Sequence, residues 1–202
     1  MEKLLNKAKD IKIIFFDIDD TLRVKDTGFM PASLTHIFEM LHQKGILTGI
    51  ATGRNLCGVV PEIKALHPDF FVTANGAYVI DKSDQVIYKQ SLPQKVVLDI
   101  VEWLTSSSAE YVVYGADQVV ASAWSDTMQS AIEPIYGQLP IDPDYHLTHD
   151  IFQMVTMSEH DDQLILPEKL SESVRMVRWH EHSSDIVPLN GSKAVGVSQV
   201  LD

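Results

Sequence analysis

The feature that most constrains the fold is a short apolar run that ends in acids. Residues 11–16 read IKIIFF, and Asp17, Asp19 and Asp20 follow within four positions. The run is β-branched, aromatic and nearly continuous, which is typical of a central strand buried on both faces of a parallel sheet. Alternate positions of an extended chain point to one side, so Asp17 and Asp19 are expected to converge beyond its carboxyl end. Open parallel sheets bind their ligands at that end.

Two converging carboxylates need compensation, because they repel one another by about 4 kcal/mol at about 4 Å when the effective dielectric constant is about 20. Such a pair persists when a cation or a shared proton offsets the repulsion. Oxygen ligands without a nearby His or Cys favour Mg²⁺ over zinc, so we expect Asp17 and Asp19 to be the metal ligands. The alternative is a solvated acidic turn, which the buried strand before it disfavours.

Composition excludes several other classes of protein. The chain has 202 residues, of which 45% are hydrophobic and 22% charged, so it suits one large or two small globular domains. Its formal net charge of -12 argues against nucleic acid or an anionic membrane as a partner. The single Cys57 excludes an internal disulfide, and no secretory signal or membrane span is evident. The cytoplasm is the expected compartment.

Hydrophobic periodicity predicts an α/β fold in two parts. A helix over 31–45 and a strand over 46–52 follow the first strand, which predicts a right-handed strand–helix–strand unit. A helix over 56–66 and a strand turning at Asn75-Gly76 come next. Beyond residue 80, alternating strands mix with helices in an antiparallel pattern. We therefore expect a core over 1–81, an inserted α+β domain over 82–184, and a return to the core over 185–202.

The segment FDIDDTL, residues 16–22, resembles the first motif (D-x-D-x-T) of the haloacid dehalogenase-like phosphatases. The resemblance implies that Asp17 is a nucleophile that forms an aspartyl-phosphate. It implies that Asp19 is the acid and base that protonates the leaving alcohol and then activates water. Asp20 stands where this family often has Gly, and we expect it to cap the turn.

Three further segments resemble motifs of the same family, in the same order. In IATGR, the hydroxyl of Thr52 would bind the transferring phosphoryl group, and in NGSKAVGV, Lys193 would steady the negative charge of nucleophile and phosphate. TANGAYV resembles the Asn-Gly segment of the Cof-type subgroup, although a plain type I′ hairpin turn is equally compatible. Arg54 either contacts phosphate or forms a structural ion pair. The candidate substrate-binding residues are Thr52, Gly53, Arg54, Asn75 and Lys193.

This resemblance implies a Rossmann-like parallel core with an inserted α/β cap that controls access to the site. The implied activity is Mg²⁺-dependent hydrolysis of small phosphorylated metabolites such as sugar phosphates. Trp103, Trp124 and Trp179 are expected to fill the interior of the cap rather than to stack on substrate.

The family's fourth motif, an acidic segment expected after Lys193, is not found in the sequence, which ends at Asp202. We therefore expect an incomplete core, an under-coordinated metal, slow turnover, and an open edge at the strand over 11–16. Such an edge favours self-association.

Other functions stay open at this stage. Receiver domains also combine Asp, Thr and Lys around Mg²⁺, but their acceptor Asp follows the third strand rather than the first. A phosphotransferase and a non-catalytic ligand-binding module are the remaining alternatives.

Overall fold

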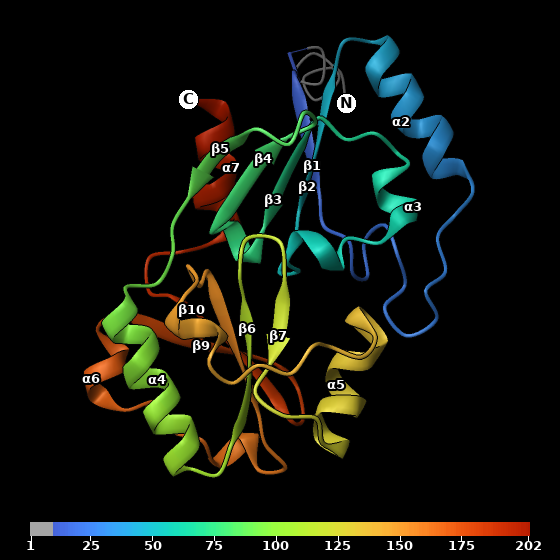
Figure 1. Ribbon diagram of the computed structural model, residues 1–202. Coiled ribbons are helices and arrows are strands. Elements are labelled where there is room, and N and C mark those ends of the chain that lie inside the picture. Colours follow the sequence, from blue (N-terminus) through green and yellow to red (C-terminus); the bar gives the residue numbers. More distant parts are fainter. Residues whose placement is uncertain (1–9) are drawn as a thin grey trace.

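The computed structural model describes residues 10–202, whose strands form two five-stranded sheets, one above the other in Figure 1. The first sheet has the order β1-β2-β3-β4-β5, and the second has the order β7-β6-β8-β10-β9. This arrangement confirms the predicted α/β class. The strands of the first sheet are β1 (Ile13–Phe16), β2 (Leu47–Ala51), β3 (Phe70–Thr73), β4 (Tyr78–Asp81) and β5 (Val86–Lys89).

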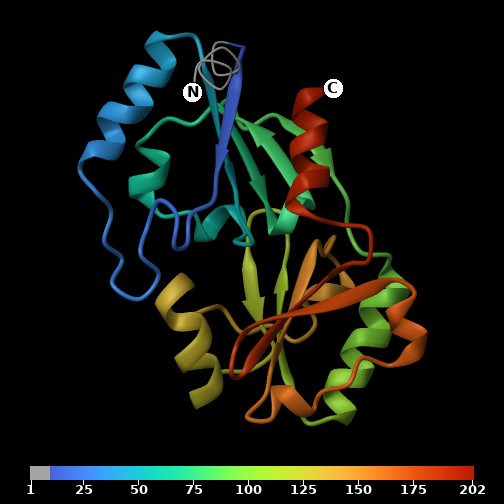
Figure 2. The same cartoon turned by 180° about the vertical axis from the view of Figure 1, so that it is seen from behind.

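The first sheet is parallel where the acids were expected. β1 pairs in parallel with β2, and β2 with β3, whereas β4 and β5 add antiparallel strands. Helix α2 (Ser33–Gln43) and the short helix α3 (Pro61–Lys64) cover one face. Helix α7 (Lys193–Leu201) packs on the opposite face, as Figure 2 shows from behind. The result is a three-layer unit in which the carboxyl ends of β1, β2 and β3 open on one side.

Two predictions for this sheet need correction. The helix predicted over 56–66 is broken into a 3-10 turn (Leu56–Gly58) and α3, because Pro61 forces Val60 into an extended conformation. The first strand was expected to be central, but among the described residues β1 is the edge strand, and its four residues are only half-buried. That position agrees with the expected open edge.

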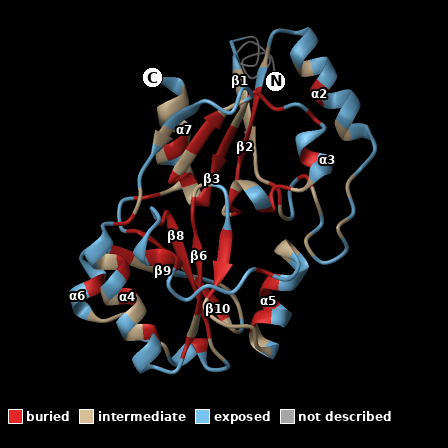
Figure 3. Ribbon diagram, in the orientation of Figure 1, coloured by how far each residue is buried: buried red, intermediate tan, exposed pale blue. Residues whose placement is uncertain are grey.

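The second sheet is antiparallel throughout and largely buried (Figure 3). Helices α4 (Gln94–Ser106) and α6 (Glu168–Ser171) pack on one face, and α5 (Asp126–Tyr136) packs on the other. Three 3-10 turns lie over Ala74–Gly76, Tyr145–Leu147 and Asp161–Gln163. The strands are β6 (Glu110–Tyr114), β7 (Val119–Ala121), β8 (Gln153–Met157), β9 (Val174–His180) and β10 (Ser183–Pro188).

Strand pairing differs from the predicted domain boundaries at both ends of the insert. In each case the chain passes from one sheet to the other at a later residue than predicted. Residues 86–89 pair with β4 and so extend the first sheet, although the insert was expected to begin at residue 82. Residues 183–188 pair with β8 and β9 in the second sheet, although the chain was expected to return at residue 185. The division into core and cap stays a prediction, and the pairing favours boundaries after β5 and after β10. Within residues 10–202, no helix is long and apolar enough to cross a bilayer.

Candidate active site

A cavity of about 180 Å³ lies where the carboxyl ends of β1 and β2 meet the second sheet. It contains every predicted site residue except Asn75. The lining also includes side chains that the sequence did not single out as functional. The full lining is Asp17, Asp19, Lys25, Thr52, Gly53, Arg54, Tyr114, Ile135, Tyr136, Trp179, Asp185 and Lys193.

Asp17 follows β1 directly and is held at both oxygens. Its Oδ1 accepts a hydrogen bond of 2.8 Å from the amide of Ile18, and its Oδ2 accepts one of 2.5 Å from Nζ of Lys193. Lys193 is the first residue of α7, which Ser192 caps by accepting a hydrogen bond from the amide of Val195. The ion pair therefore brings the predicted third motif against the first.

Two glycines explain how α7 comes close enough for this contact. Gly76 has a φ of +95°, and a Cβ there would lie 2.1 Å from the carbonyl oxygen of Ser192. A Cβ on Gly196 would lie 2.6 Å from Cγ1 of Val72 on β3. The first turn of α7 thus rests directly on the turn after β3, and side chains at these two positions would push it away.

Asp19 is paired with Arg54 rather than with Asp17. Nε of Arg54 donates to Oδ2 at 2.9 Å, and Nη2 donates to Oδ1 at 2.7 Å. The third guanidinium nitrogen donates to the carbonyl of Gly58, so Arg54 is only 5% exposed. Burial alone would raise the pKa of Asp19, but the hydrogen bonds and charge of Arg54 outweigh it and lower that pKa. Of the two roles considered for Arg54, the structure has the ion pair.

Thr52 is buried directly after β2 and belongs to the cavity lining. Its amide donates to the carbonyl of Val72, and its Oγ1 accepts from the amide of Arg54 at 3.1 Å. The hydroxyl hydrogen has no partner among the described residues, so it is free to donate to an anion. Beside it, a Cβ on Gly53 would lie 3.2 Å from the side chain of Asn75.

Asn75 joins the two sheets instead of lining the cavity. It adopts a left-handed conformation with φ of 53° in the 3-10 turn between β3 and β4, which replaces the simple hairpin considered from the sequence. Its Nδ2 donates to Oε1 of Gln153 and to Oδ2 of Asp185, both at 2.9 Å. Its predicted role in substrate binding stays a prediction.

Asp20 occupies the turn as expected. Its φ of 57° lies in the left-handed region, which explains why glycine suits the position, and its Oδ1 accepts from the amide of Lys25.

Asp185 is the main residue that the sequence analysis missed. It lies in the middle of β10, and burial raises its pKa to about 6, although the hydrogen bond from Asn75 and the nearby indole of Trp179 favour the charged form. The positive charges of Lys193 and Lys25 act in the same direction. Asp185 is nevertheless partly accessible, and it lines the cavity. Asp185 precedes the apolar pair Ile186 and Val187 in a segment interpreted only as the return of the chain to the core, so little in the local sequence marked it.

Trp179 corrects a second expectation, because it lines the cavity as well as packing on the interior of the second sheet. Nζ of Lys25 lies 4.8 Å from the centroid of its ring, a cation–π contact between the two halves of the site. The indole N–H is buried without a hydrogen-bond partner among the described residues.

The donor types at the site suit Mg²⁺, but the set is partial. Asp17 and Asp19 provide hard carboxylate oxygens, as this ion prefers. Both oxygens of Asp19 are occupied by Arg54. Over residues 10–202, no group of three or more His, Cys, Asp or Glu side chains is arranged to hold a metal. The oxygens of Asp17 likewise accept from the amide of Ile18 and from Lys193, so either carboxylate would bind the ion through its remaining lone pairs.

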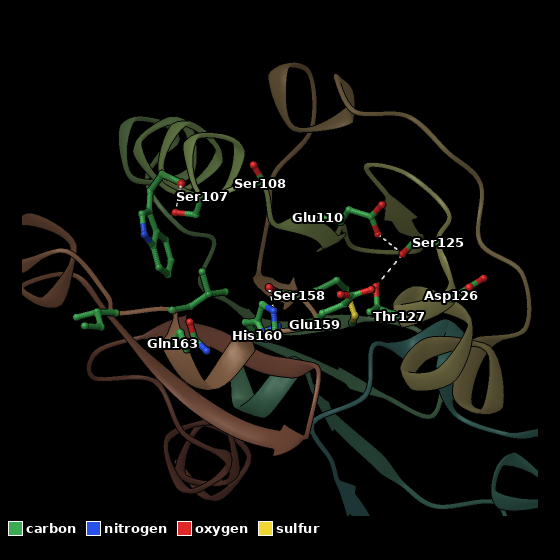
Figure 4. A pocket seen from close by; sticks show the side chains of 14 residues that line it. Ser107, Ser108, Glu110, Ser125, Asp126, Thr127, Ser158, Glu159, His160 and Gln163 are labelled. Atoms are coloured by element: carbon green, nitrogen blue, oxygen red, sulfur yellow. Dashed lines mark hydrogen bonds between the residues drawn. The ribbon is translucent and has the colours of Figure 1, made fainter.

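A larger hollow of about 910 Å³ lies elsewhere, at the far end of the second sheet (Figure 4). Its acids are Glu110, Asp126 and Glu159, and Ser125 donates a hydrogen bond to Glu110. None of the predicted site residues lines it. Size alone therefore does not identify the functional site of this protein.

Comparison with known proteins gives a consistent family. The haloacid dehalogenase-like hydrolase family matches residues 14–202. A Streptococcus pyogenes protein named "putative bifunctional phosphatase/peptidyl-prolyl cis-trans isomerase" is 48% identical over 200 residues, which are 99% of this chain and 43% of that protein. The chain thus spans less than half the length of this relative.

Two further proteins extend the match. "Putative phosphatase YkrA" of Bacillus subtilis is 30% identical over 203 residues, covering 96% of this chain and 74% of that protein. The crystal structure of a hypothetical protein from Geobacillus kaustophilus superposes with a TM-score of 0.81 at 31% identity, covering 95% of this chain and 74% of the other.

Proposed function

Because the chain belongs to the haloacid dehalogenase-like hydrolase family, with the layout of its Cof type, we propose that it hydrolyses small phosphate monoesters through an aspartyl-phosphate on Asp17. The observation that carries this proposal is that Asp17, Asp19, Thr52 and Lys193 line one cavity at the carboxyl ends of β1 and β2. Phosphoryl transfer needs a nucleophile, an acid, a hydroxyl donor and a cation in one place.

In the proposed first step, an oxygen of Asp17 bonds to phosphorus while the ester P–O bond breaks. The leaving alcohol oxygen takes a proton from Asp19. In the second step, a water oxygen bonds to phosphorus, the bond from phosphorus to Asp17 breaks, and Asp19 takes a proton from that water. The products are the alcohol and inorganic phosphate, and both carboxyl groups return to their starting states.

Asp19 needs to change partners to act as the acid. In the described arrangement both of its oxygens accept from Arg54, and its pKa is lowered, so it carries no proton to give. We propose that the phosphoryl group of the substrate draws the guanidinium of Arg54 away from Asp19. A guanidinium binds phosphate oxygens as well as it binds carboxylate. Asp19, still desolvated and without its counterion, then gains a proton more readily.

We also propose that Mg²⁺ binds at Asp17. Asp19, the other predicted ligand, would bind the ion only in its ionised form, so it would not hold the ion while it carries the proton for the leaving alcohol. When bound, the ion would neutralise the charge of an anionic substrate approaching a chain of net charge -12. The cavity is smaller than the roughly 300–1,000 Å³ of typical ligand pockets. A small phosphorylated metabolite, such as a sugar phosphate, is the class of substrate that this volume favours.

The test is hydrolysis of p-nitrophenyl phosphate by the wild type, Asp17→Asn and Asp20→Asn, with Mg²⁺ and with a chelator. We expect Asp17→Asn to lower kcat by roughly 1,000-fold or more, because the amide cannot attack phosphorus. Asp20→Asn is the matched control, since Asn tolerates the left-handed conformation and the Asp20 side chain is outside the cavity lining. We expect it to retain activity within about threefold.

The outcome also separates the alternatives. Turnover that survives Asp17→Asn would refute the covalent mechanism. One equivalent of p-nitrophenol without further turnover would favour a phospho-accepting module, and a phosphorylated product from added alcohol would favour a transferase.

A further inference from the structure

Asp185 is the single carboxylate that the second sheet contributes to the lining of the catalytic cavity among the described residues. The lining carries three acids and three bases. Asp17 is paired with Lys193 and Asp19 with Arg54, which leaves Lys25 and Asp185 without an ion-pair partner within 4 Å over residues 10–202. The two acids that follow β1 are therefore neutralised by ion pairs, whereas the acid that the second sheet contributes is not.

The backbone of β10 fixes the direction of this carboxylate. Asp185 lies opposite Val155 of β8 in the antiparallel register, and the next residue, Ile186, packs into the interior under α4. Successive side chains of a strand point to opposite faces, so Asp185 points away from α4, toward the side that the cavity occupies.

One oxygen of Asp185 is already occupied and the other is not. Oδ2 accepts the hydrogen bond from Asn75, and Oδ1 accepts no side-chain or backbone hydrogen bond within 3.5 Å among the described residues. The raised pKa of Asp185 indicates that little water compensates its charge. A carboxylate in this condition is a strong acceptor for a donor group that enters the cavity.

The neighbours of Asp185 indicate which donor group would fit. Trp179 and Tyr136 give this end of the cavity aromatic faces, which suit the C–H surface of a small alcohol. A carboxylate on the substrate would be repelled by Asp185 in a partly desolvated site, whereas a hydroxyl group would donate to it. The phosphoryl end, with Thr52 and Lys193, lies at the first sheet.

We propose that Asp185 selects the leaving alcohol by accepting a hydrogen bond from a hydroxyl group of a small, neutral polyol. This inference rests on the proposed function, because it assigns the phosphoryl group to Asp17 and the alcohol to the second sheet. It makes Asp185 a specificity-determining residue, whereas Asn75 contributes the hydrogen bond that joins the two sheets.

The test compares glycerol 1-phosphate with n-propyl phosphate, which differ by two hydroxyl groups, and adds 3-phosphoglycerate as the anionic substrate. We expect the wild type to prefer glycerol 1-phosphate over n-propyl phosphate by roughly 10- to 100-fold in kcat/KM, the range for a hydrogen bond to a charged group. In Asp185→Ala this preference falls toward one. Because the change also removes the hydrogen bond from Asn75, hydrolysis of n-propyl phosphate falls as well, but no further than in Asn75→Ala. Asp185→Asn, which keeps the shape and one acceptor, gives an intermediate preference.

Asn75→Ala separates selection from a purely structural role. It removes the hydrogen bond between the sheets but leaves the carboxylate in place, so we expect both esters to lose activity together and the preference to remain. If Asp185→Ala instead lowers both esters equally, Asp185 only joins the sheets and the proposal is wrong. A wild type that prefers 3-phosphoglycerate would also overturn it.

Binding to Asp17→Asn keeps the inference testable apart from catalysis. Calorimetry with this variant should give a Kd for glycerol 1-phosphate roughly tenfold or more below that for n-propyl phosphate, and the added Asp185→Ala change should remove the difference. Hydrolysis of p-nitrophenyl phosphate that depends on Asp17, without any preference between the two esters in rate or binding, would defeat this inference and leave the proposed function intact. A lower Kd for glycerol 1-phosphate than for n-propyl phosphate, without turnover of any ester, would support the role of Asp185 and contradict the proposed function.

Discussion

The two sheets contribute to the cavity in different ways. The first sheet contributes side chains that follow strands, as Asp17 follows β1 and Thr52 follows β2. The second contributes side chains from strand interiors or ends, such as Tyr114 of β6 and Asp185 of β10. A parallel sheet gathers the carboxyl ends of its strands on one side, whereas an antiparallel sheet alternates its strand ends and also offers residues from a face. We therefore infer that the strand ends of the first sheet carry the reaction chemistry and that the second sheet selects the substrate.

The role assigned to the first sheet depends on the close packing of α7 against it. A substitution at Gly76 would disrupt that packing. Gly76→Ala would put a Cβ 2.1 Å from the carbonyl of Ser192 at a φ of +95°, so strain and clash add. We expect a loss of about 2–5 kcal/mol in the free energy of unfolding, measured in urea, and a fall in activity because Lys193 moves from Asp17.

Gly45→Ala is the matched control for that change. Gly45 also has a positive φ, of +70°, but nothing lies within 4 Å of a Cβ built there. We expect a cost of about 1 kcal/mol without loss of activity. Equal costs for the two variants would mean that backbone strain alone, and not the approach of α7, explains Gly76.

The same contrast explains what the sequence could predict. Asp17, Asp19 and Thr52 directly follow apolar strands, so local pattern and family resemblance located them, and all three line the cavity. Asp185 was missed because its partner Asn75 lies 110 residues away, and only the packing of the second sheet against the first brings them together. The Asp19–Arg54 pair, 35 residues apart, was likewise an open choice until the fold was known.

The strand pairing departs from the predicted domain boundaries for a related physical reason. Residues 86–89 alternate like an exposed strand of either sheet, and only pairing with β4 assigns them to the first. The return segment contains a strand whose hydrogen-bond partners, β8 and β9, are themselves in the insert. Strand existence is readable from local sequence, but membership of a sheet is a long-range property.

Asp185 also makes the second sheet sensitive to pH. Its pKa is about 6 in the folded protein against an ordinary value of 3.8, so the folded state holds the proton more tightly. Stability from this group is present below about pH 4 and is lost as the pH rises through about 6, by at most about 3 kcal/mol. Lys193 and Lys25 limit the loss by favouring the charged form.

The measurement is urea unfolding of the wild type and Asp185→Asn between pH 4 and pH 7. We expect the variant to lack this loss, so that its stability relative to the wild type increases with pH. Parallel curves for the two proteins would show that Asp185 is not desolvated as described.

The smallest effect is expected where the sheets touch away from Asp185. Asn55 is buried after β2, and its Nδ2 donates to the carbonyl of Gly115 at 2.6 Å, across the boundary between the sheets. Its Oδ1 accepts from the amide of Cys57, and its own amide donates to the hydroxyl of Tyr136. Asn55→Ala should cost about 1–2 kcal/mol, because the Gly115 carbonyl and the Cys57 amide each lose a partner.

Asn55→Asp sharpens this prediction, since aspartate can still accept from the amide of Cys57 but cannot donate to the carbonyl of Gly115. If the contact between the sheets matters for function, both variants raise KM for p-nitrophenyl phosphate several-fold, and Asp is at least as harmful as Ala. The exposed Asn190, changed to Ala, is the control and should stay within about 0.5 kcal/mol of the wild type. If Asn55→Asp leaves stability and KM unchanged, Asn55 stabilises only its own turn. The contact between the two sheets would then depend on Asn75 and Asp185.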